Sequence, residues 1–168
     1  PYLLLAQGSG KSLQLNGSAW VEVPAHPALN SNVFTLAFWA NQNGQTQPGT
    51  YSRLTSRQND TFEIGLSAAG RVTYYPGPGW QDTLYNLPAT GWRHLAFVST
   101  GSQMTLYVNG KVAATGTFSG NPAGLLRFGA RHNGTEGSRG LMDDTALWNE
   151  ALSPLAIQAL ATGVFAPE

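Results

Sequence analysis

The sequence predicts an all-β protein, folded as a two-sheet antiparallel β-sandwich with jelly-roll connections and one short C-terminal helix. Three observations support this fold class. Short runs of alternating apolar and polar residues recur along the chain, and clusters of Gly, Pro, Asn and Asp separate them. Three such runs follow one another between Gly91 and Phe118. Helix signals occur only near the C-terminus, and many short strands at turn-punctuated spacing are typical of sandwiches and jelly rolls.

The segment from Gly91 to Phe118 predicts a meander of antiparallel strands. His94–Ser99 and Met104–Val108 both alternate in hydrophobicity, as half-buried strands do. The dipeptide Asn109-Gly110 follows the second run. Asn-Gly between alternating runs is the strongest short-range hairpin signal, because a type I′ turn needs positive φ at both central residues.

Further strands are predicted by similar patterns at Leu3–Ala6, Ser12–Asn16, Trp20–Val23, Val33–Asn41, Tyr51–Arg57, Phe62–Ser67, Arg71–Tyr75, Leu125–Ala130 and Gly140–Trp148. Val33–Asn41 is apolar on both faces, so this strand is expected to be central and covered on both sides. An N-cap serine, a proline at the first helical position and Gly163 after the last turn predict a helix over Ser153–Thr162. All 168 residues are expected to form a single domain, residues 1–168.

Composition narrows the classes of partner. Lys and Arg number 9, Asp and Glu number 9, and the net charge is therefore zero. Nucleic acids and anionic membranes both attract a basic surplus, so neither is expected as a partner. No cysteine is present, which excludes disulfides, thiol catalysis and thiolate metal sites. Leu3–Ala6 is too short for a signal sequence or a membrane span, and membrane insertion is not expected.

The same composition suits a secreted or cell-surface protein, most simply a bacterial one. Charged residues make up only 11% of the chain, so Gly, Ser, Thr, Asn and Gln must supply much of the polar surface. The chain begins at Pro1 rather than at Met. We therefore expect it to be either a mature product or a piece cut from a longer polypeptide, whose other domains are then expected as partners.

Four segments, taken in order, resemble the laminin-G-like domains of the concanavalin A-like lectin/glucanase superfamily, and more distantly the pentraxins: Ser12–Pro24, Phe34–Asn41, Gly91–Gly116 and Arg139–Leu160. The resemblance implies two antiparallel sheets stacked face to face, one of them curved. It also implies recognition of glycans or proteins by the loops and the concave face, often with Ca²⁺ nearby.

The superfamily also contains glycoside hydrolases, whose catalytic carboxylates lie two residues apart on one strand. None of the predicted strands carries two acidic residues at that spacing. Asp143 and Asp144 are adjacent, so an extended strand would direct them to opposite faces. His26 and His94 are interpreted as structural, and no nucleophile-elbow motif is present. The sequence therefore predicts no enzymatic activity for this chain, and a glycoside hydrolase is its least supported function.

Aromatic residues outside the apolar pattern predict a carbohydrate-binding function. Trp80 follows the segment Pro76-Gly77-Pro78-Gly79, which cannot continue a regular strand, and Tyr75 and Tyr85 flank that loop. Flat aromatic rings hold the apolar face of a sugar, and nearby polar groups bind its hydroxyls. These residues are predicted to contact a glycan or polysaccharide. Trp80 could instead anchor its own loop by packing on the prolines.

Two further groups of residues are candidate ligand contacts. Trp20 and Glu22 share one face of their predicted strand. Arg131, His132 and Asn133 lie together in a polar loop. The alternative function is a structural or protein-binding domain, an adhesion or spacer unit. Burial of Trp80, Tyr75 and Trp20 would favour that alternative.

Arg53 and Arg57 occupy alternate positions of one predicted strand, as do Tyr51 and Thr55. Alternate side chains of a strand point to the same side, so the pattern places these residues on one strand face. A solvated strand face explains this pattern. Bidentate contact with an acidic sugar or another carboxylate is the alternative.

Calcium is the expected ion, because it prefers oxygen ligands. The resemblance implies that an acid of the Gly-x-x-Asp-Asp stretch holds Ca²⁺, which here means Asp143 or Asp144. Alternatively these acids pair with Arg131 or Arg139, or cap neighbouring loops. A zinc site is not expected from three scattered histidines without cysteine.

Overall fold

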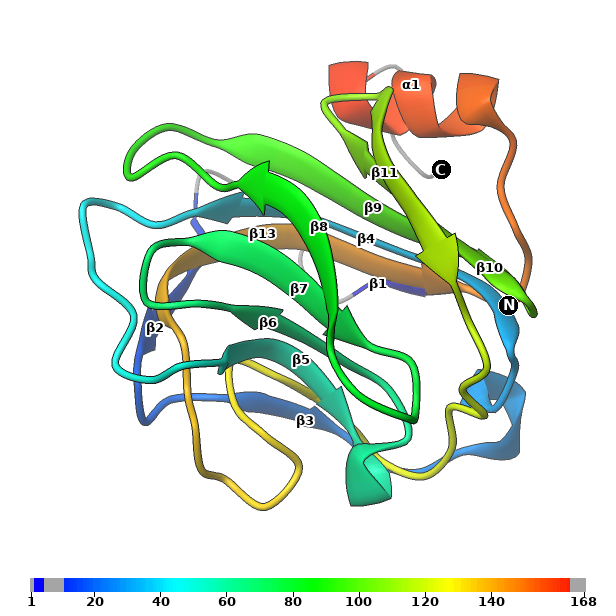
Figure 1. Cartoon of the computed structure of the whole chain (residues 1–168), viewed down its shortest axis with the longest axis horizontal. Helices are drawn as coiled ribbons and strands as arrows, with labels where there is room; N and C mark the ends of the chain where they lie inside the picture. Colours follow the sequence, from blue (N-terminus) through cyan, green and yellow to red (C-terminus); the bar gives the residue numbers. More distant parts are fainter. Residues whose placement is uncertain (1, 5–10, 164–168) are drawn as a thin grey trace.

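The computed structural model describes residues 2–4 and 11–163, and these residues form two antiparallel sheets stacked face to face (Figure 1). The seven-stranded sheet has the order β1 (Tyr2–Leu4), β13 (Arg139–Trp148), β4 (Val33–Asn41), β9 (Arg93–Thr100), β10 (Gln103–Val108) and β11 (Lys111–Thr117), and β2 (Leu13–Asn16) also pairs with β13. The six-stranded sheet has the order β3 (Val21–Val23), β12 (Leu126–Phe128), β5 (Ser52–Arg57), β6 (Glu63–Leu66), β7 (Arg71–Tyr75) and β8 (Gln81–Asn86). The predicted two-sheet sandwich is confirmed.

The core lies between the two sheets and is built from the inward-facing half of each strand. It contains fully buried aromatic and aliphatic side chains from both sheets, including Phe38, Phe97, Ile64, Leu66 and Phe128. Alternation of side chains along a strand directs the intervening residues outward. The outer faces of the two sheets are therefore the surfaces available to a helix or a ligand.

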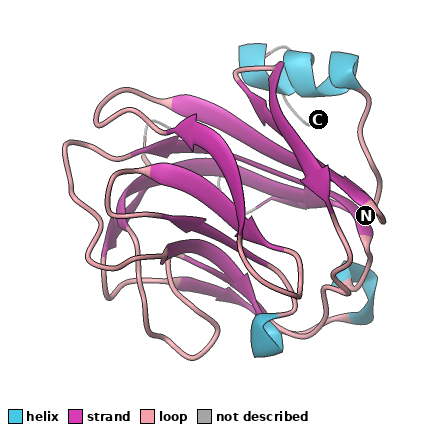
Figure 2. Cartoon of the chain, viewed as in Figure 1, coloured by secondary structure: helices cyan, strands magenta, loops and turns pink. Residues whose placement is uncertain are grey.

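A helix covers part of the outer face of the seven-stranded sheet. Helix α1 (Pro154–Thr162) begins after the N-cap Ser153 and ends at Gly163, which has φ 71°, as the sequence predicts. Ile157 is fully buried against Ala37 and Ala96 of this sheet. Figure 2 shows the helix on the side of the seven-stranded sheet that faces away from the six-stranded sheet. None of the helices in the described ranges is long and apolar enough to span a membrane.

The meander contains the predicted Asn-Gly turn between β10 and β11. Asn109 and Gly110 have φ 48° and 78°, both positive as a type I′ turn requires. A Cβ at Gly110 would lie 2.9 Å from the Cα of Gln158. Glycine is therefore needed here for its φ and because α1 packs directly on the turn.

Most predicted strands are present, with small differences at their ends. The predicted strand Leu3–Ala6 overlaps β1, and Leu5 and Ala6 lie outside the described residues. Strand β8 was not predicted, because Gln81–Asn86 forms an edge strand without a regular apolar pattern. Two single-turn 3-10 helices, η1 (Pro27–Leu29) and η2 (Gln58–Asp60), occur in segments predicted as loops.

The prediction that Arg53 and Arg57 share a solvated strand face is wrong. The pairing of β5 with β6 shifts between Arg53 and Thr55, and this irregularity changes which side of the sheet the following residues occupy. Arg53 lies on the outer face and Arg57 lines a cavity between the sheets. The two side chains are 4% and 2% exposed.

Candidate functional site

The outer face of the six-stranded sheet carries a row of residues set by strand pairing. Arg53 pairs with Gly65, Gly65 with Thr73, and Thr73 with Asp82. Because Gly65 has no side chain, the row contains a gap. Atoms Cη2 and Cζ3 of Trp80 lie 3.2 Å from the position that a Cβ on Gly65 would occupy. The side chain of Trp80 therefore extends from its loop and packs directly on the outer face of the sheet.

Trp80 is the centre of an aromatic cluster on this face. Its ring stacks on Tyr51 with a centroid separation of 4.5 Å and an interplanar angle of 6°. Tyr75 lies 5.6 Å away at 57°, and the Arg53 guanidinium carbon lies 4.6 Å from the indole ring. The three aromatic rings are half-buried. The structure thus brings Trp80 and Tyr75 together as predicted, and it adds Tyr51.

Tyr85 lies apart from this cluster. It is half-buried on β8 and packs against the core. Burial raises the pKa of its phenol. Tyr85 was predicted to join Trp80 only because it flanks the loop that contains Trp80.

A groove of 330 Å³ runs beside the aromatic cluster. Tyr51 and Trp80 form one wall, and the remaining lining residues are small or polar: Thr50, Ser67, Ala69, Arg71, Thr73 and Asp82. Arg71 Nη1 lies 3.3 Å from Asp82 Oδ2, and Arg71 Nε donates a hydrogen bond to Asn86 Oδ1 at 2.8 Å. The groove therefore combines flat apolar rings with hydroxyl, guanidinium and carboxylate groups.

A second group of predicted residues lies in the loop 131–139, beside η2. Arg131 Nε donates to Asp60 Oδ1 at 2.9 Å, and a second guanidinium nitrogen contacts Asp60 Oδ2. His132 Nδ1 lies 2.8 Å from Asp60 Oδ1. The hydrogen bond from Arg131 lowers the pKa of Asp60 to about 2. The carboxylate of Asp60 therefore holds both Arg131 and His132. Asn133 is exposed and accepts hydrogen bonds from the backbone N–H and the hydroxyl of Thr135.

Arg53 joins this loop to the aromatic cluster. Its Nε lies 3.0 Å from Glu63 Oε2, and its Nη2 lies 3.2 Å from Glu136 Oε2 in the loop. Its backbone N–H donates to the Glu136 carbonyl at 2.8 Å. Glu63 is buried, and burial raises its pKa despite the hydrogen bond from Arg53. The guanidinium of Arg53 thus contacts both the loop's acid and the ring of Trp80.

Three side chains of this region could hold a metal ion. Ligand atoms of Asp60, Glu63 and His132 all lie within 4.8 Å of one another. The carboxylates already pair with Arg131 and Arg53, and an imidazole is not a ligand that Ca²⁺ prefers. This donor set does not fit calcium.

The acids predicted to bind calcium lie on the other sheet. Asp143 and Asp144 are in β13, next to an irregularity in its pairing with β4. Asp143 Oδ1 accepts a hydrogen bond from the Asp144 N–H at 2.9 Å, and Asp144 has φ 43°. Asp143 is half-buried and Asp144 is exposed.

Trp20 and Glu22 lie together at the edge strand β3, as predicted from their shared face. Glu22 forms an ion pair with Arg127, whose guanidinium carbon lies 4.9 Å from the Trp20 ring. Trp20 is 44% exposed and lies next to Gly134 of the loop 131–139. Trp20 is exposed, and Tyr75 and Trp80 are half-buried, so none of the three has the full burial expected of a spacer domain.

Several solved structures share this fold. Domain 4 of an extracellular arabinanase from Geobacillus stearothermophilus, solved with arabinotriose, is 22% identical with a TM-score of 0.70, covering 96% of this chain and 81% of that one. The binding domain of botulinum neurotoxin DC, in complex with SialylT, is 13% identical with a TM-score of 0.71, covering 97% and 45%. A heptameric SAP-like pentraxin from Limulus polyphemus is 14% identical with a TM-score of 0.67, covering 88% and 80%.

These identities are low, so the likenesses establish the fold. The chain spans less than half the length of the neurotoxin binding domain. No curated protein sequence matches the chain. A sequence profile of the Laminin_G_3 family, described as the concanavalin A-like lectin/glucanases superfamily, matches residues 15–158. That match covers most of the chain, and the chain therefore belongs to the Laminin_G_3 family of this superfamily.

Proposed function

We propose that the chain is a non-catalytic carbohydrate-binding module of a larger secreted or cell-surface bacterial protein. The observation that carries this proposal is the groove beside Trp80, with its aromatic wall and polar lining. An arabinanase domain solved with arabinotriose and a neurotoxin binding domain solved with SialylT share the fold. Both are named as parts of larger proteins, which supports the role of an attached module.

In the proposed complex, a sugar contacts the aromatic wall with its apolar C–H face. Tyr51 stacks in parallel on one face of the Trp80 ring, so the sugar contacts a pair of stacked rings and not an isolated indole face. The hydroxyls of Thr50 and Ser67, together with the Arg71–Asp82 pair, supply hydrogen bonds to the sugar hydroxyls.

The balance of charge favours a neutral sugar. Arg71 pairs with Asp82 inside the groove. Arg53, which lies over Trp80, is neutralised by Glu63 and Glu136. Neither cation is available to a sugar carboxylate without breaking an existing ion pair. A neutral oligosaccharide therefore fits the groove better than a sialylated or uronic-acid glycan.

Binding of neutral oligosaccharides is the direct test. A glycan array followed by calorimetry should identify a ligand, and Trp80→Ala should weaken its binding at least tenfold. Removal of an aromatic ring on which a nucleobase stacks costs about 1–3 kcal/mol in other proteins, and the ~1.4 kcal/mol of a tenfold change lies within that range. Trp20→Ala is the matched control, because it removes an exposed tryptophan from the same sheet. An array without any ligand, or unchanged binding by Trp80→Ala, would refute the proposal.

Calcium is a separate part of the proposal. Asp143 and Asp144 supply carboxylate oxygens, the ligand type that Ca²⁺ prefers. Calcium should then raise the unfolding temperature of the wild-type protein but not that of Asp143→Asn/Asp144→Asn. Equal responses of the two proteins would place any calcium elsewhere.

A protein-binding domain is the second candidate. Exposed Trp20, stacked over Arg127, favours it, because aromatic and Arg side chains are enriched at protein interfaces. In that case Trp20→Ala, and not Trp80→Ala, would abolish the interaction.

A further inference from the structure

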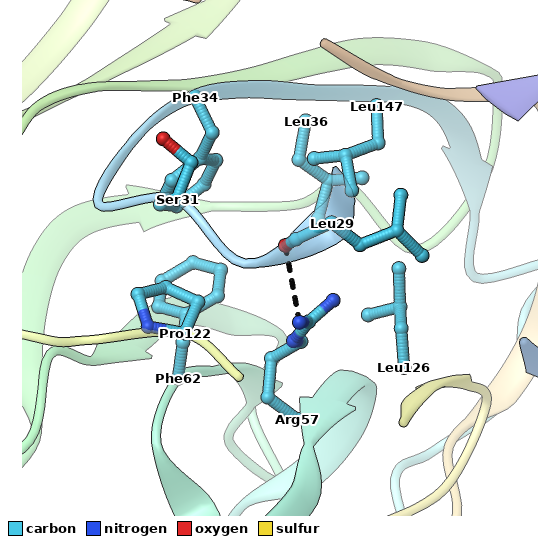
Figure 3. A pocket seen from close by; sticks show the side chains of 9 residues that line it. All are labelled: Leu29, Ser31, Phe34, Leu36, Arg57, Phe62, Pro122, Leu126 and Leu147. Atoms are coloured by element: carbon cyan, nitrogen blue, oxygen red, sulfur yellow. Dashed lines mark hydrogen bonds between the residues drawn. The ribbon is translucent and has the colours of Figure 1, made fainter. Parts of the chain in front are cut away.

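Leu84 is a large apolar side chain that extends into solvent near the groove. Other leucines fill the interior, and Figure 3 shows buried Leu36, Leu126 and Leu147 around the small cavity between the two sheets. Leu84 is instead 75% exposed, and it lies on β8, the edge strand of the six-stranded sheet. Single exposed apolar residues are common on protein surfaces, so exposure alone assigns no role to Leu84.

The backbone conformation of Leu84 is unfavourable. Its φ is 60°, in the left-handed region that leucine rarely adopts. The other non-glycine residues with positive φ in the described ranges are Asn, Asp or Glu, and Asn and Asp tolerate this region better. Because most of its side chain is in solvent, Leu84 gains little packing from this conformation. A conformation of this kind points to a function where the surrounding structure maintains it.

The surrounding structure maintains it through a bulge in β8. Arg71 pairs with Asn86 and Thr73 pairs with Asp82, so three residues of β8 lie opposite one residue of β7. Leu84 is the middle residue of the three. Bulges redirect side chains, and they are over-represented next to functional sites.

The two residues that flank Leu84 in the bulge are directed inward. Thr83 is buried, and its hydroxyl donates a hydrogen bond to the Val72 carbonyl at 2.7 Å. Tyr85 packs against the core. These contacts fix both neighbours to the sandwich, and Leu84 is the bulge residue that is left facing the solvent.

Residues of the groove hold both ends of this bulge. Arg71 Nη1 lies 3.3 Å from Asp82 Oδ2, and Arg71 Nε donates to Asn86 Oδ1 at 2.8 Å. Asp82 Oδ1 also accepts a hydrogen bond from the Leu84 N–H at 2.8 Å. The Cα of Leu84 therefore lies within about 4.3 Å of that oxygen, since an N–Cα bond measures about 1.5 Å. Arg71 and Asp82 both line the groove, so Leu84 is directly next to it.

We propose that Leu84 is an additional sugar contact, which extends the groove across β8 to the edge of the six-stranded sheet. This role rests on the proposed carbohydrate-binding function, and it specifies the ligand as a linear neutral oligosaccharide or polysaccharide longer than the groove. One part of the sugar chain contacts the aromatic wall of Tyr51 and Trp80. A later unit of the same sugar chain, beyond Arg71 and Asp82, places its apolar C–H face on the Leu84 side chain.

The first experiment measures affinities by calorimetry for linear oligosaccharides of arabinose, mannose and glucose, each as the trisaccharide and the hexasaccharide. Leu84→Asn removes the apolar surface and introduces a residue that tolerates positive φ. It should weaken hexasaccharide binding about five- to tenfold, the loss expected for roughly 40–60 Å² of apolar contact, and leave trisaccharide binding unchanged. Leu84→Met keeps an apolar side chain of similar size and should retain most of the hexasaccharide affinity.

Leu155→Asn is the matched control, because it makes the same substitution at a leucine that is 77% exposed on α1. It should change neither affinity. Equal hexasaccharide affinities of the wild type and Leu84→Asn, or equal losses for both sugar lengths, would overturn the role of Leu84 and leave the groove as the binding site. A wild-type protein that binds none of these oligosaccharides would refute the proposed function as well.

The second experiment observes the wild-type side chain directly, by NMR of isotope-labelled leucine methyl groups. The Leu84 methyl resonances are identified by their absence from the spectrum of Leu84→Asn. They should shift when the hexasaccharide is added and stay in place with the trisaccharide, whereas the Leu155 resonances should not respond to either. Unshifted Leu84 resonances in the saturated hexasaccharide complex would exclude the contact.

Discussion

At the scale of single residues, Gly65 determines where Trp80 lies. Trp80 contacts the sheet because the strand position beneath it has no side chain. Tyr51 then stacks on the ring and Arg53 lies over it. The aromatic wall of the groove is therefore a consequence of one missing methyl group as much as of the aromatic residues themselves.

Gly65→Ala should displace Trp80 and weaken glycan binding. The new Cβ would lie 3.2 Å from two atoms of the indole, closer than ordinary packing allows. Overpacking of this kind costs about 1–3 kcal/mol, and the ring can relieve it by moving away from the sheet. Tryptophan fluorescence reports the displacement of Trp80, and calorimetry measures the glycan affinity. Gly49→Ala is the control, because its Cβ would approach only the Ser52 hydroxyl, at 3.8 Å. Unchanged fluorescence and affinity in Gly65→Ala would contradict this account.

His94 should make stability depend on pH. Burial lowers its pKa from 6.5 to about 4, and its ring packs edge-on against Trp39 at 5.4 Å. The unfolded chain binds a proton near pH 6.5 and the folded chain does not, so stability falls as pH decreases from 6.5 towards 4. The full loss is about 3 kcal/mol for this single group. Urea unfolding at several pH values should show a steeper decline for the wild type than for His94→Gln. Parallel curves for the two proteins would mean that His94 does not cause the decline.

At the scale of elements, the strands could be predicted and the site only in part. Alternation and the Asn109-Gly110 turn identify the meander because these signals are local. Strand β8 lacks such a signal, since it is an edge strand with one buried residue among six. The pairing irregularity after Arg53 has no sequence signature, and it decides which sides Arg53 and Arg57 occupy. Trp80 could be identified from its loop, whereas Tyr51 and Gly65 required the cross-strand register.

The buried Arg53–Glu63 ion pair should contribute to the free energy of unfolding as a coupled pair. Arg53→Met would leave Glu63 buried without its guanidinium, and breaking a buried pair in this way costs about 3–5 kcal/mol. Arg53→Met/Glu63→Gln should cost less than the sum of the single changes, because neither charge is then left alone. The measurement is a double-mutant cycle of unfolding free energies. Additive losses would show that the two side chains are not energetically coupled.

At the scale of the whole molecule, the two outer faces have different roles. Helix α1 covers part of the seven-stranded sheet (Figure 1). Its contact is made through Ile157, and the groove lies on the outer face of the six-stranded sheet. The core between the sheets separates these faces. In the proposed function, the six-stranded sheet is the face that binds the ligand and the helix belongs to the supporting scaffold.

Scaffold and groove should therefore respond separately to substitution. Ile157→Ala removes a fully buried side chain from the interface between α1 and the sheet, and it should cost about 2–5 kcal/mol of unfolding free energy. Glycan affinity should stay the same, because the groove lies beyond the core on the other sheet. Leu155→Ala is the control within the same helix, since Leu155 is 77% exposed and its removal should change neither quantity. Urea unfolding measures the free energy of unfolding. Calorimetry at a temperature where both variants are folded measures the glycan affinity. A loss of affinity in Ile157→Ala would show that α1 influences the groove through the core, which would make the two faces one coupled unit.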